Sequence, residues 1–240
     1  MTISGQELAA TPAAERGPRA RMKRMMLDTA MRLMKSGLVP SVSDVAEAAE
    51  VSRATAYRYF PSQAAMVQAA VDSGLGPILE WESPAQDVEV RVTDLIAFSY
   101  PRITVHEATH RAALRLALDQ WSRRQGGANG EEPQIVRGNR KRLLRKALAP
   151  LNGEIRRETF DRLTQALSLM FGIEAMVVLR DIWGLSPEQA ERVAVWSARS
   201  LVRSAIAESG KKQSASVAAK KKTPVSKPRN DREKQKRAVQ

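Results

Sequence analysis

The sequence predicts an all-α protein in which a small N-terminal bundle of three helices precedes a larger helical domain. Apolar residues recur at three- and four-residue spacing through most of the chain, and signals for β-strands are few. A hydrophobic content of 43% over 240 residues is sufficient for a substantial core. The chain contains no cysteine, so this core must hold without disulfides or thiolate-bound metal.

The first predicted helix begins at Pro18. Residues 1–17 are rich in small residues, with two glycines and a proline, and we expect a disordered arm. After Pro18 the apolar side chains recur at helical spacing, and Gly37 is a typical helix end. The apolar positions are Met22, Met25, Met26, Ala30, Leu33 and Met34. At this spacing we interpret the methionines as core residues rather than as a metal site or a flexible groove.

Residues 42–60 predict two short helices joined by a tight turn. Val42, Val45, Ala46 and Ala49 share one face of the first helix, which Ser41 or Ser43 could cap. Ser52 is a good N-cap for the second helix, in which Ala56 and Phe60 can face the first. This is the layout of a helix-turn-helix.

The outward side of the second helix carries hydrogen-bonding side chains. They are Arg53, Thr55, Tyr57, Arg58 and Tyr59. Arginine can pair with both acceptors of a guanine edge, while threonine and tyrosine suit thymine methyl groups and phosphates. We therefore expect this helix to read double-stranded DNA; the alternative is an ordinary surface helix of a bundle.

The stretch from residue 51 to 62, Val-Ser-Arg-Ala-Thr-Ala-Tyr-Arg-Tyr-Phe-Pro-Ser, resembles the DNA-binding signature of the TetR family of transcriptional regulators. The preceding residues 43–49 match it too, and the resemblance runs from about Arg19 to Val71. It implies a DNA-binding domain over residues 18–72 and a ligand-binding and dimerisation domain over 73–209. The expected DNA contacts are Ser41, Ser43, Ser52, Arg53, Thr55, Tyr57, Arg58, Tyr59 and Gln63.

Two positions depart from the family pattern. Glu50 occupies the turn where glycine is usual, and a non-glycine residue at positive φ costs about 1 kcal/mol. Gln63 stands where the family often has a lysine that contacts a phosphate, so a charge-assisted contact becomes a neutral one. Additional phosphate contacts could come from the basic start of the first helix, at Arg19, Arg21, Lys23 and Arg24.

The remaining chain predicts further helices. We expect one from Val88 that stops near Pro101, a second over Thr104–Gln125 and a third over Gly138–Leu148. Phe160–Leu179 predicts a long helix that is apolar on two sides, and Ser186-Pro-Glu-Gln begins the last long helix with a capping box. Because one protomer cannot bury both apolar sides, we expect a homodimer through these last two helices. Its two recognition helices would read a palindromic operator.

The middle helices supply candidates for an effector pocket. Proteins of the TetR family release DNA when a small molecule binds, and the resemblance implies an effector of unknown identity here. The aromatic candidates are Phe98, Tyr100, His110 and Trp121, which could equally be core residues. His106, Glu107 and His110 also form the His-Glu-x-x-His string of zinc proteases. We expect neither metal nor cofactor and no enzymatic activity, because no third ligand is evident.

The net charge of +13 is concentrated at the C-terminus. Residues 210–240 hold eleven lysines and arginines against two acidic residues, and we expect a disordered basic tail. The tail could aid solubility, or tether the protein to DNA without reading sequence. It therefore leaves a nonspecific, nucleoid-type DNA binder as the alternative to a repressor.

The sequence gives no sign of membrane insertion or secretion. The longest nearly uncharged run, Ala166–Leu179, is 14 residues long and includes Glu174, which is too short to span a bilayer. The N-terminus lacks the features of a signal peptide. We expect a cytoplasmic protein that binds no membrane.

Overall fold

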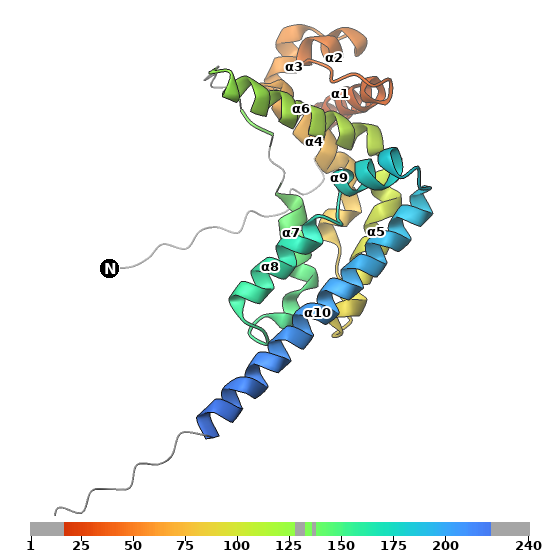
Figure 1. Cartoon of the computed structure of the whole chain (residues 1–240). Helices are drawn as coiled ribbons and strands as arrows, with labels where there is room; N and C mark the ends of the chain where they lie inside the picture. Colours follow the sequence, from red (N-terminus) through yellow and green to blue (C-terminus); the bar gives the residue numbers. More distant parts are fainter. Residues whose placement is uncertain (1–16, 128–132, 136–137, 222–240) are drawn as a thin grey trace, which may run out of the picture.

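A computed structural model describes residues 17–127, 133–135 and 138–221, and within these residues the protein is helical without strands. Four helices, α1 (Pro18–Lys35), α2 (Val42–Ala48), α3 (Arg53–Tyr59) and α4 (Gln63–Leu75), form a head at one end of the molecule (Figure 1). The expected arm at 1–17 falls outside the described residues except for Gly17.

The larger helical body follows the head (Figure 1). Its elements are a 3₁₀ turn η1 (Gly76–Glu80), α5 (Val88–Val105), α6 (Glu107–Gln125), α7 (Asn139–Ala147), a second 3₁₀ turn η2 (Ala149–Leu151), α8 (Arg157–Ser168), α9 (Ile173–Met176), the π-helical η3 (Val177–Ile182) and α10 (Pro187–Lys221). α6 crosses the head and packs against α1 and α4, whereas α10 lies along the body against α5 and α8.

Two hydrophobic cores hold these parts together, and α4 contributes to both. Met66 and Val67 of α4 are completely buried in the core of the head, together with residues of α1, α2, α3 and α6. Leu75, at the other end of α4, is buried in the core of the body. Val71 packs against both cores. α4 is therefore the rigid connection between the head and the body.

The expected end of a helix near Pro101 is wrong, because α5 continues through this proline to Val105. Proline lacks an N–H group and normally interrupts the hydrogen bonds of the preceding turn. Here the Arg102 guanidinium donates to the Phe98 carbonyl at 2.7 Å and lies over the Phe98 ring. Tyr100 and Ile103 on either side are buried, so packing maintains the helix.

The expected single helix over Phe160–Leu179 is also wrong. The chain leaves α8 at Ser168 and resumes as α9 at Ile173, with the two segments bent by 51°. Gly172 makes the break, with φ 117° and ψ −171°, a conformation open almost only to glycine. A Cβ atom at Gly172 would lie 2.6 Å from a guanidinium nitrogen of Arg140. The side chain of Arg140 fills the space that the glycine leaves.

The last helix begins as expected and ends later than expected. Ser186 and Gln189 form the predicted capping box, with the Ser186 N–H donating to Gln189 Oε1 at 2.8 Å and the Gln189 N–H to Ser186 Oγ at 3.3 Å. α10 then extends to Lys221, so disorder from residue 210 is wrong for residues 210–221. The alanines and lysines of that stretch favour helix once α10 has been nucleated by packing. Residues 222–240 of the predicted tail lie outside the described residues.

In the part of the chain that the structure describes, no single helix is long and apolar enough to span a membrane. α8 together with α9 and η3 passes that test only as a bent pair. Leu163, Leu167, Ile173 and Met176 of this pair are buried in the core of the body.

Replacement of Gly172 by alanine tests the break between α8 and α9. We expect Gly172→Ala to lower the free energy of unfolding by about 3 kcal/mol, because backbone strain adds to the displacement of Arg140. Gly184 is a matched control, since it has φ 65° and open space around it. Gly184→Ala should cost only about 1 kcal/mol. If urea denaturation shows that the two variants lose the same free energy of unfolding, the role assigned to Arg140 is contradicted.

Candidate nucleic-acid interface and buried cavity

Side-chain caps fix the starts of both helices of the helix-turn-helix. Ser41 Oγ accepts from the Asp44 N–H at 3.1 Å, and the Asp44 carboxylate accepts from the Ser41 N–H at 2.8 Å. Ser41, rather than Ser43, is therefore the cap of α2. Ser52 caps α3 by accepting from the Thr55 N–H at 3.1 Å, as predicted. These bonds satisfy N–H groups that a helix otherwise leaves unpaired.

The turn between α2 and α3 confirms the expectation for Glu50. This residue has φ 53° and is the only non-glycine residue with positive φ among those described. The turn closes through hydrogen bonds from Glu50 N to Glu47 O at 3.1 Å and from Val51 N to Ala46 O at 2.9 Å. The burial of Ala46 and Ala56 on the facing sides of α2 and α3 holds the two helices together despite the strain.

α3 buries one side and exposes the other. Ala56 is buried, and Phe60 directly after the helix is buried as well. Arg53 and Arg58 are exposed, and Tyr57 is 46% exposed. Thr55 is half-buried, and its hydroxyl accepts a hydrogen bond from Ser52 Oγ at 2.9 Å. The outward side of α3 thus presents two guanidinium groups and a phenol within two helical turns.

Two tyrosines connect α3 to its neighbours. The Tyr57 hydroxyl lies 3.5 Å from Ser43 Oγ of α2, so these two expected contact residues are adjacent. The half-buried Tyr59 ring has the guanidinium groups of Arg58 and of Arg19 in α1 near its centre, at 5.8 and 5.9 Å. Arg19 therefore brings the basic start of α1 next to α3, which helical spacing alone did not reveal.

Gln63 has a different role from the one expected. It is the first residue of α4, and its Nε2 donates to the carbonyl oxygens of Val39 and Pro40 at 3.0 and 3.1 Å. These bonds use the amide hydrogens that a phosphate contact would need. We therefore assign Gln63 to the connection between α4 and the segment before α2, and no longer expect it to contact DNA.

Comparisons with known proteins agree with this geometry. The family model of bacterial regulatory proteins of the tetR family matches residues 26–70, which run from the middle of α1 through α2 and α3 to the middle of α4. Residues 26–70 therefore match a TetR-family DNA-binding region. Over 59 residues it is 36% identical to the HTH-type transcriptional repressor LfrR of Mycolicibacterium smegmatis, covering 25% of this chain and 31% of LfrR.

The match to LfrR therefore spans about a third of that repressor's length. The similarity to a solved structure extends further along the chain. The crystal structure of a tetR-family transcriptional regulator from Streptomyces coelicolor has a TM-score of 0.57, covering 87% of this chain and 92% of that one. At 15% identity this similarity shows a shared fold.

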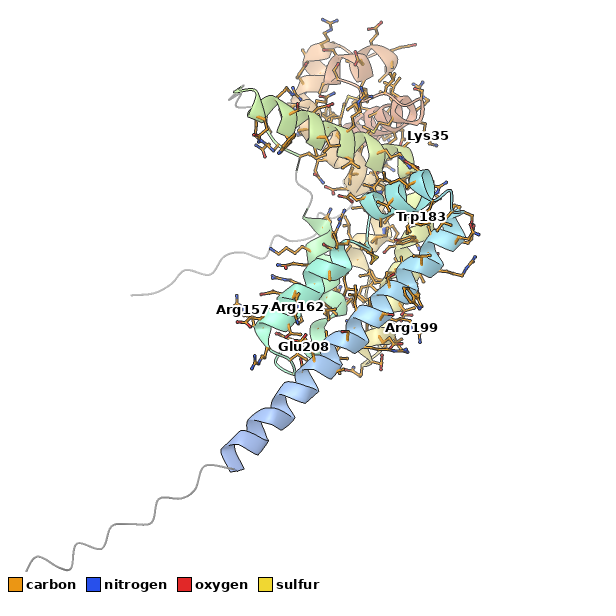
Figure 2. All side chains as sticks on the ribbon, viewed as in Figure 1. Lys35, Arg157, Arg162, Trp183, Arg199 and Glu208 are labelled. Carbon is orange, nitrogen blue, oxygen red and sulfur yellow. The ribbon has the colours of Figure 1, made fainter. Side chains whose placement is uncertain are left out.

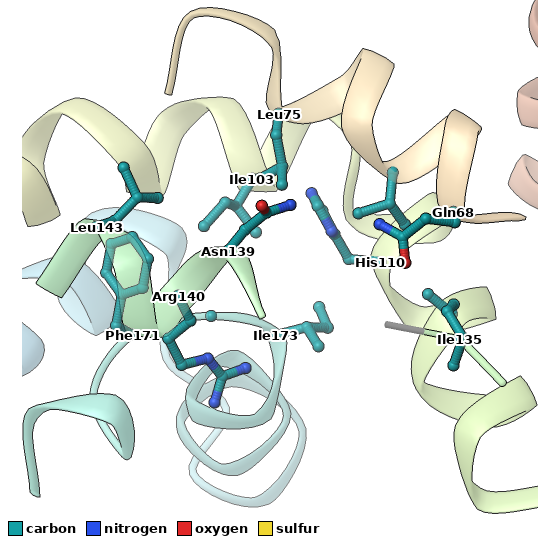
Figure 3. Close-up of a pocket in the computed structure, with 13 residues that line it drawn as sticks. Gln68, Leu75, Ile103, His110, Ile135, Asn139, Arg140, Leu143, Phe171 and Ile173 are labelled. Atoms are coloured by element: carbon teal, nitrogen blue, oxygen red, sulfur yellow. The ribbon is translucent and has the colours of Figure 1, made fainter. Parts of the chain in front are cut away.

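The body contains a cavity of about 90 Å³ where it meets the head. One wall consists of Gln68, Val71 and Leu75 of α4, and the others come from α5, α6, α7, Ile135 and the segment around Gly172 (Figure 3). Most of the lining is apolar, including Ile103 and Phe171. Because α4 borders the cavity and also carries the core of the head, a molecule in the cavity would touch the connection between the two parts.

Polar side chains converge on this cavity. Gln68 Nε2 and Asn139 Nδ2 both donate to Asp72 Oδ1 at 3.0 Å. Gln68 Oε1 and His110 Nε2 are buried without a hydrogen-bond partner among the described residues. Burial lowers the pKa of His110 from 6.5 to about 4, with a further contribution from the nearby His106 and an opposing one from Glu174.

Of the four aromatic and imidazole candidates for an effector pocket, His110 alone lines the cavity. Tyr100 is a core residue whose hydroxyl donates to the Met170 carbonyl at 2.7 Å. Phe98 packs under Arg102, and Trp121 is 56% exposed on α6. Phe98, Tyr100 and Trp121 do not line this cavity, because aromatic residue type alone does not determine which part of the packing a ring enters. The polar lining from Gln68 and Asn139 was not foreseen, since both are ordinary surface residue types.

The His-Glu-x-x-His string has structural roles. Glu107 is ion-paired with Arg111, its Oε1 2.8 Å from the guanidinium, and with Arg180 of η3. Among the described residues no group of three or more histidine, aspartate or glutamate side chains could hold a metal ion. The family model that matches residues 26–70 describes bacterial regulatory proteins.

The pH dependence of stability tests the burial of His110. Because its folded pKa of about 4 is below the unfolded value, the unfolded state binds more protons as the pH falls from 6.5 to 4. The free energy of unfolding should therefore fall in this range. Between pH 7 and pH 5 the wild type should lose about 2 kcal/mol more than His110→Gln, which cannot titrate. If urea denaturation shows the same change in the free energy of unfolding between pH 7 and pH 5 for both proteins, a buried, neutral His110 is contradicted.

Proposed function

We propose that the protein is a dimeric, sequence-specific DNA-binding repressor that a small molecule releases from a palindromic operator. The observation that carries this proposal is the outward side of α3, where Arg53, Tyr57 and Arg58 are exposed on a capped helix with a buried opposite side. A rigid helix with such side chains suits insertion into a major groove. A DNA partner is consistent with a cytoplasmic location.

The proposed DNA contacts divide into two groups. Arg53 and Thr55, near the start of α3, would face base edges. The second group would position the domain on phosphates, and it consists of Ser41, Ser43, Ser52, Tyr57, Arg58 and Tyr59. Arg19 lies beside Tyr59. This division follows from the position of each side chain along α3 and at the helix starts, where N–H groups and hydroxyls favour phosphate oxygens.

Dimerisation would use apolar side chains that the protomer leaves exposed. We use the name exposed apolar face for five exposed side chains of η3, its end and the adjoining α10, which are Val178, Ile182, Trp183, Val193 and Trp196. Trp183 lies at the end of η3 near the start of α10 (Figure 2), and it and Trp196 are each 71% exposed. Large apolar side chains exposed together are typical of an interface. A two-fold axis there would hold the two heads at a fixed separation.

Release of DNA would follow from the position of the cavity. A ligand can shift the equilibrium only if it binds the conformation that does not bind DNA more tightly. Gln68, Val71 and Leu75 line the cavity on the same helix that carries the core of the head. A ligand that moved α4 by a small amount would therefore change the separation of the two recognition helices.

Arg53→Ala tests base recognition. We first select a binding sequence from random duplexes, and then compare variants on that sequence and on duplexes with single base changes. Arg53→Ala should weaken binding by about 1–3 kcal/mol and relax the preference at one position of each half-site. Arg157→Ala, which removes an exposed arginine of α8, is the control and should bind as the wild type does.

Two results would contradict the proposal. If no sequence is enriched, the protein is a nonspecific binder of the nucleoid type. Truncation after Gly210 would then remove nearly all binding, because residues 211–240 carry eleven positive charges. If Arg53→Ala weakens binding equally on every sequence, Arg53 contacts phosphate rather than a base.

Trp196→Glu tests the dimer. A carboxylate buried in an apolar interface is costly, so the dimer Kd should rise roughly 10-fold or more, as for a typical interface hot spot. Sedimentation equilibrium measures this directly. Trp121→Glu is the matched control, because Trp121 is an exposed tryptophan of α6 outside the exposed apolar face. If both variants sediment as the wild type does, α10 is not the dimer interface.

A further inference from the structure

We infer that the cavity binds a small, uncharged, mainly apolar molecule with one hydroxyl or amide N–H group, which donates a hydrogen bond to Gln68. This inference deepens the proposed function, since it names the class of effector. It rests on the orientation of Gln68, the burial of His110 and the apolar character of the other walls.

The amide of Gln68 has its orientation fixed by a neighbour. Asp72 Oδ1 accepts hydrogen bonds from Gln68 Nε2 and from Asn139 Nδ2, both at 3.0 Å. A carboxylate can only accept, so the NH₂ group of Gln68 must be the end that faces it. Gln68 Oε1 is left buried, as an acceptor without a partner in the described chain. A ligand group that meets this oxygen must donate.

His110 adds a second polar atom from the opposite helix. Its Nε2 is also buried without a partner among the described residues, and the side chain is 8% exposed (Figure 3). Because burial keeps the imidazole neutral, it offers one N–H and one lone pair rather than a charge. A hydroxyl group can donate to Gln68 Oε1, and it can pair with either tautomer of a neutral imidazole, so an alcohol or phenol suits this lining.

The charged groups near the cavity disfavour an ionic ligand. Arg140, the cation in the lining, is paired with Glu174 and donates to the Ser168 carbonyl at 3.1 Å. An anion would lie near the Asp72 carboxylate that orients Gln68, and a cation would meet the Arg140 guanidinium. Neither charge would regain its hydration among Ile103, Leu143 and Phe171.

The size of the cavity limits the ligand further. About 90 Å³ is several times the space that one water molecule needs. An apolar cavity of about 150 Å³ holds benzene, so one substituted ring requires this cavity to expand somewhat and a fused polycyclic molecule requires it to expand far more. A monocyclic phenol therefore matches the cavity in charge and hydrogen bonding and needs the least expansion among aromatic ligands.

The test uses three probes of nearly equal shape with the full chain, in isothermal titration calorimetry without DNA. p-Cresol carries a hydroxyl group, toluene lacks it, and 4-methylbenzoate carries a negative charge. We expect p-cresol to bind roughly 10-fold or more tightly than toluene, because toluene leaves Gln68 Oε1 without a partner. 4-Methylbenzoate should bind more weakly than either.

Two variants assign the preference to Gln68. Gln68→Leu should retain affinity for toluene and lose the preference for p-cresol, and retained toluene binding shows that the cavity is intact. Gln68→Met is a second variant in case leucine disturbs folding. Gln125→Leu is the control, because Gln125 is an exposed glutamine at the end of α6. This variant should keep the wild-type ratio of the affinities for p-cresol and toluene.

Several results would overturn the inference. They are equal affinities for p-cresol and toluene in the wild type, tightest binding of 4-methylbenzoate, an unchanged ratio in both Gln68 variants, or no binding of any probe. The readout is independent of the proposed function. p-Cresol binding that leaves DNA affinity unchanged would contradict ligand release but not the ligand class, and a failure to select any DNA sequence would not alter the calorimetry.

Discussion

The burial of α4 in two hydrophobic cores is the constraint on which the rest of the structure depends. Ala64, Met66 and Val67 are fixed in the head, and Leu75 in the body, over only three turns of helix. A helix of this length behaves as a rigid rod, so the head cannot reorient without repacking one core. Gly74 reinforces the constraint, because a Cβ there would come within 3.1 Å of the His106 ring at the junction of α5 and α6.

α6 extends this connection towards the exposed apolar face. It contributes Ala112, Ala113 and Leu116 to the core of the head. From the same helix, Arg111 forms a bidentate pair with Asp181 of η3, with both distances 2.6 Å, and Glu107 pairs with Arg180. The last residue of η3, Ile182, and the next residue, Trp183, both belong to the exposed apolar face. The head, the cavity and the proposed dimer face are therefore joined through α4 and α6, and in the proposed function these packed helices would couple the ligand to DNA.

Local patterns in the sequence sufficed for the helix-turn-helix. The cap at Ser52, the buried Ala56 and Phe60 and the strained Glu50 all follow from interactions within about ten residues, and each was predicted. The helices of the body were predicted less well, because their ends depend on distant residues. Pro101 stays helical because Tyr100 and Ile103 beside it are buried, and α9 begins after Gly172, where Arg140 occupies the space that a Cβ atom would fill.

The candidate sites also divide into features set by neighbouring residues and features set by distant ones. The residues on the outward side of α3 were predicted, whereas Gln63 was misassigned because its partners, Val39 and Pro40, lie more than twenty positions earlier. The cavity draws on five helices, and its defining polar group, Gln68, gains its orientation only from Asp72 and the distant Asn139. Such convergence of separate segments has no local signal, and of the expected pocket residues only His110 lines this cavity.

The distance between the two heads of a dimer tests the central claim most directly. Because the chain has no cysteine, Ala48→Cys places a single spin label on the exposed end of α2, beside the proposed DNA-reading helix. Double electron–electron resonance should give one interspin distance in the free protein and a narrower distribution on the selected duplex, consistent with recognition helices roughly 34 Å apart. Absence of dipolar coupling, or a broad distribution that the selected duplex leaves unchanged, would contradict the account.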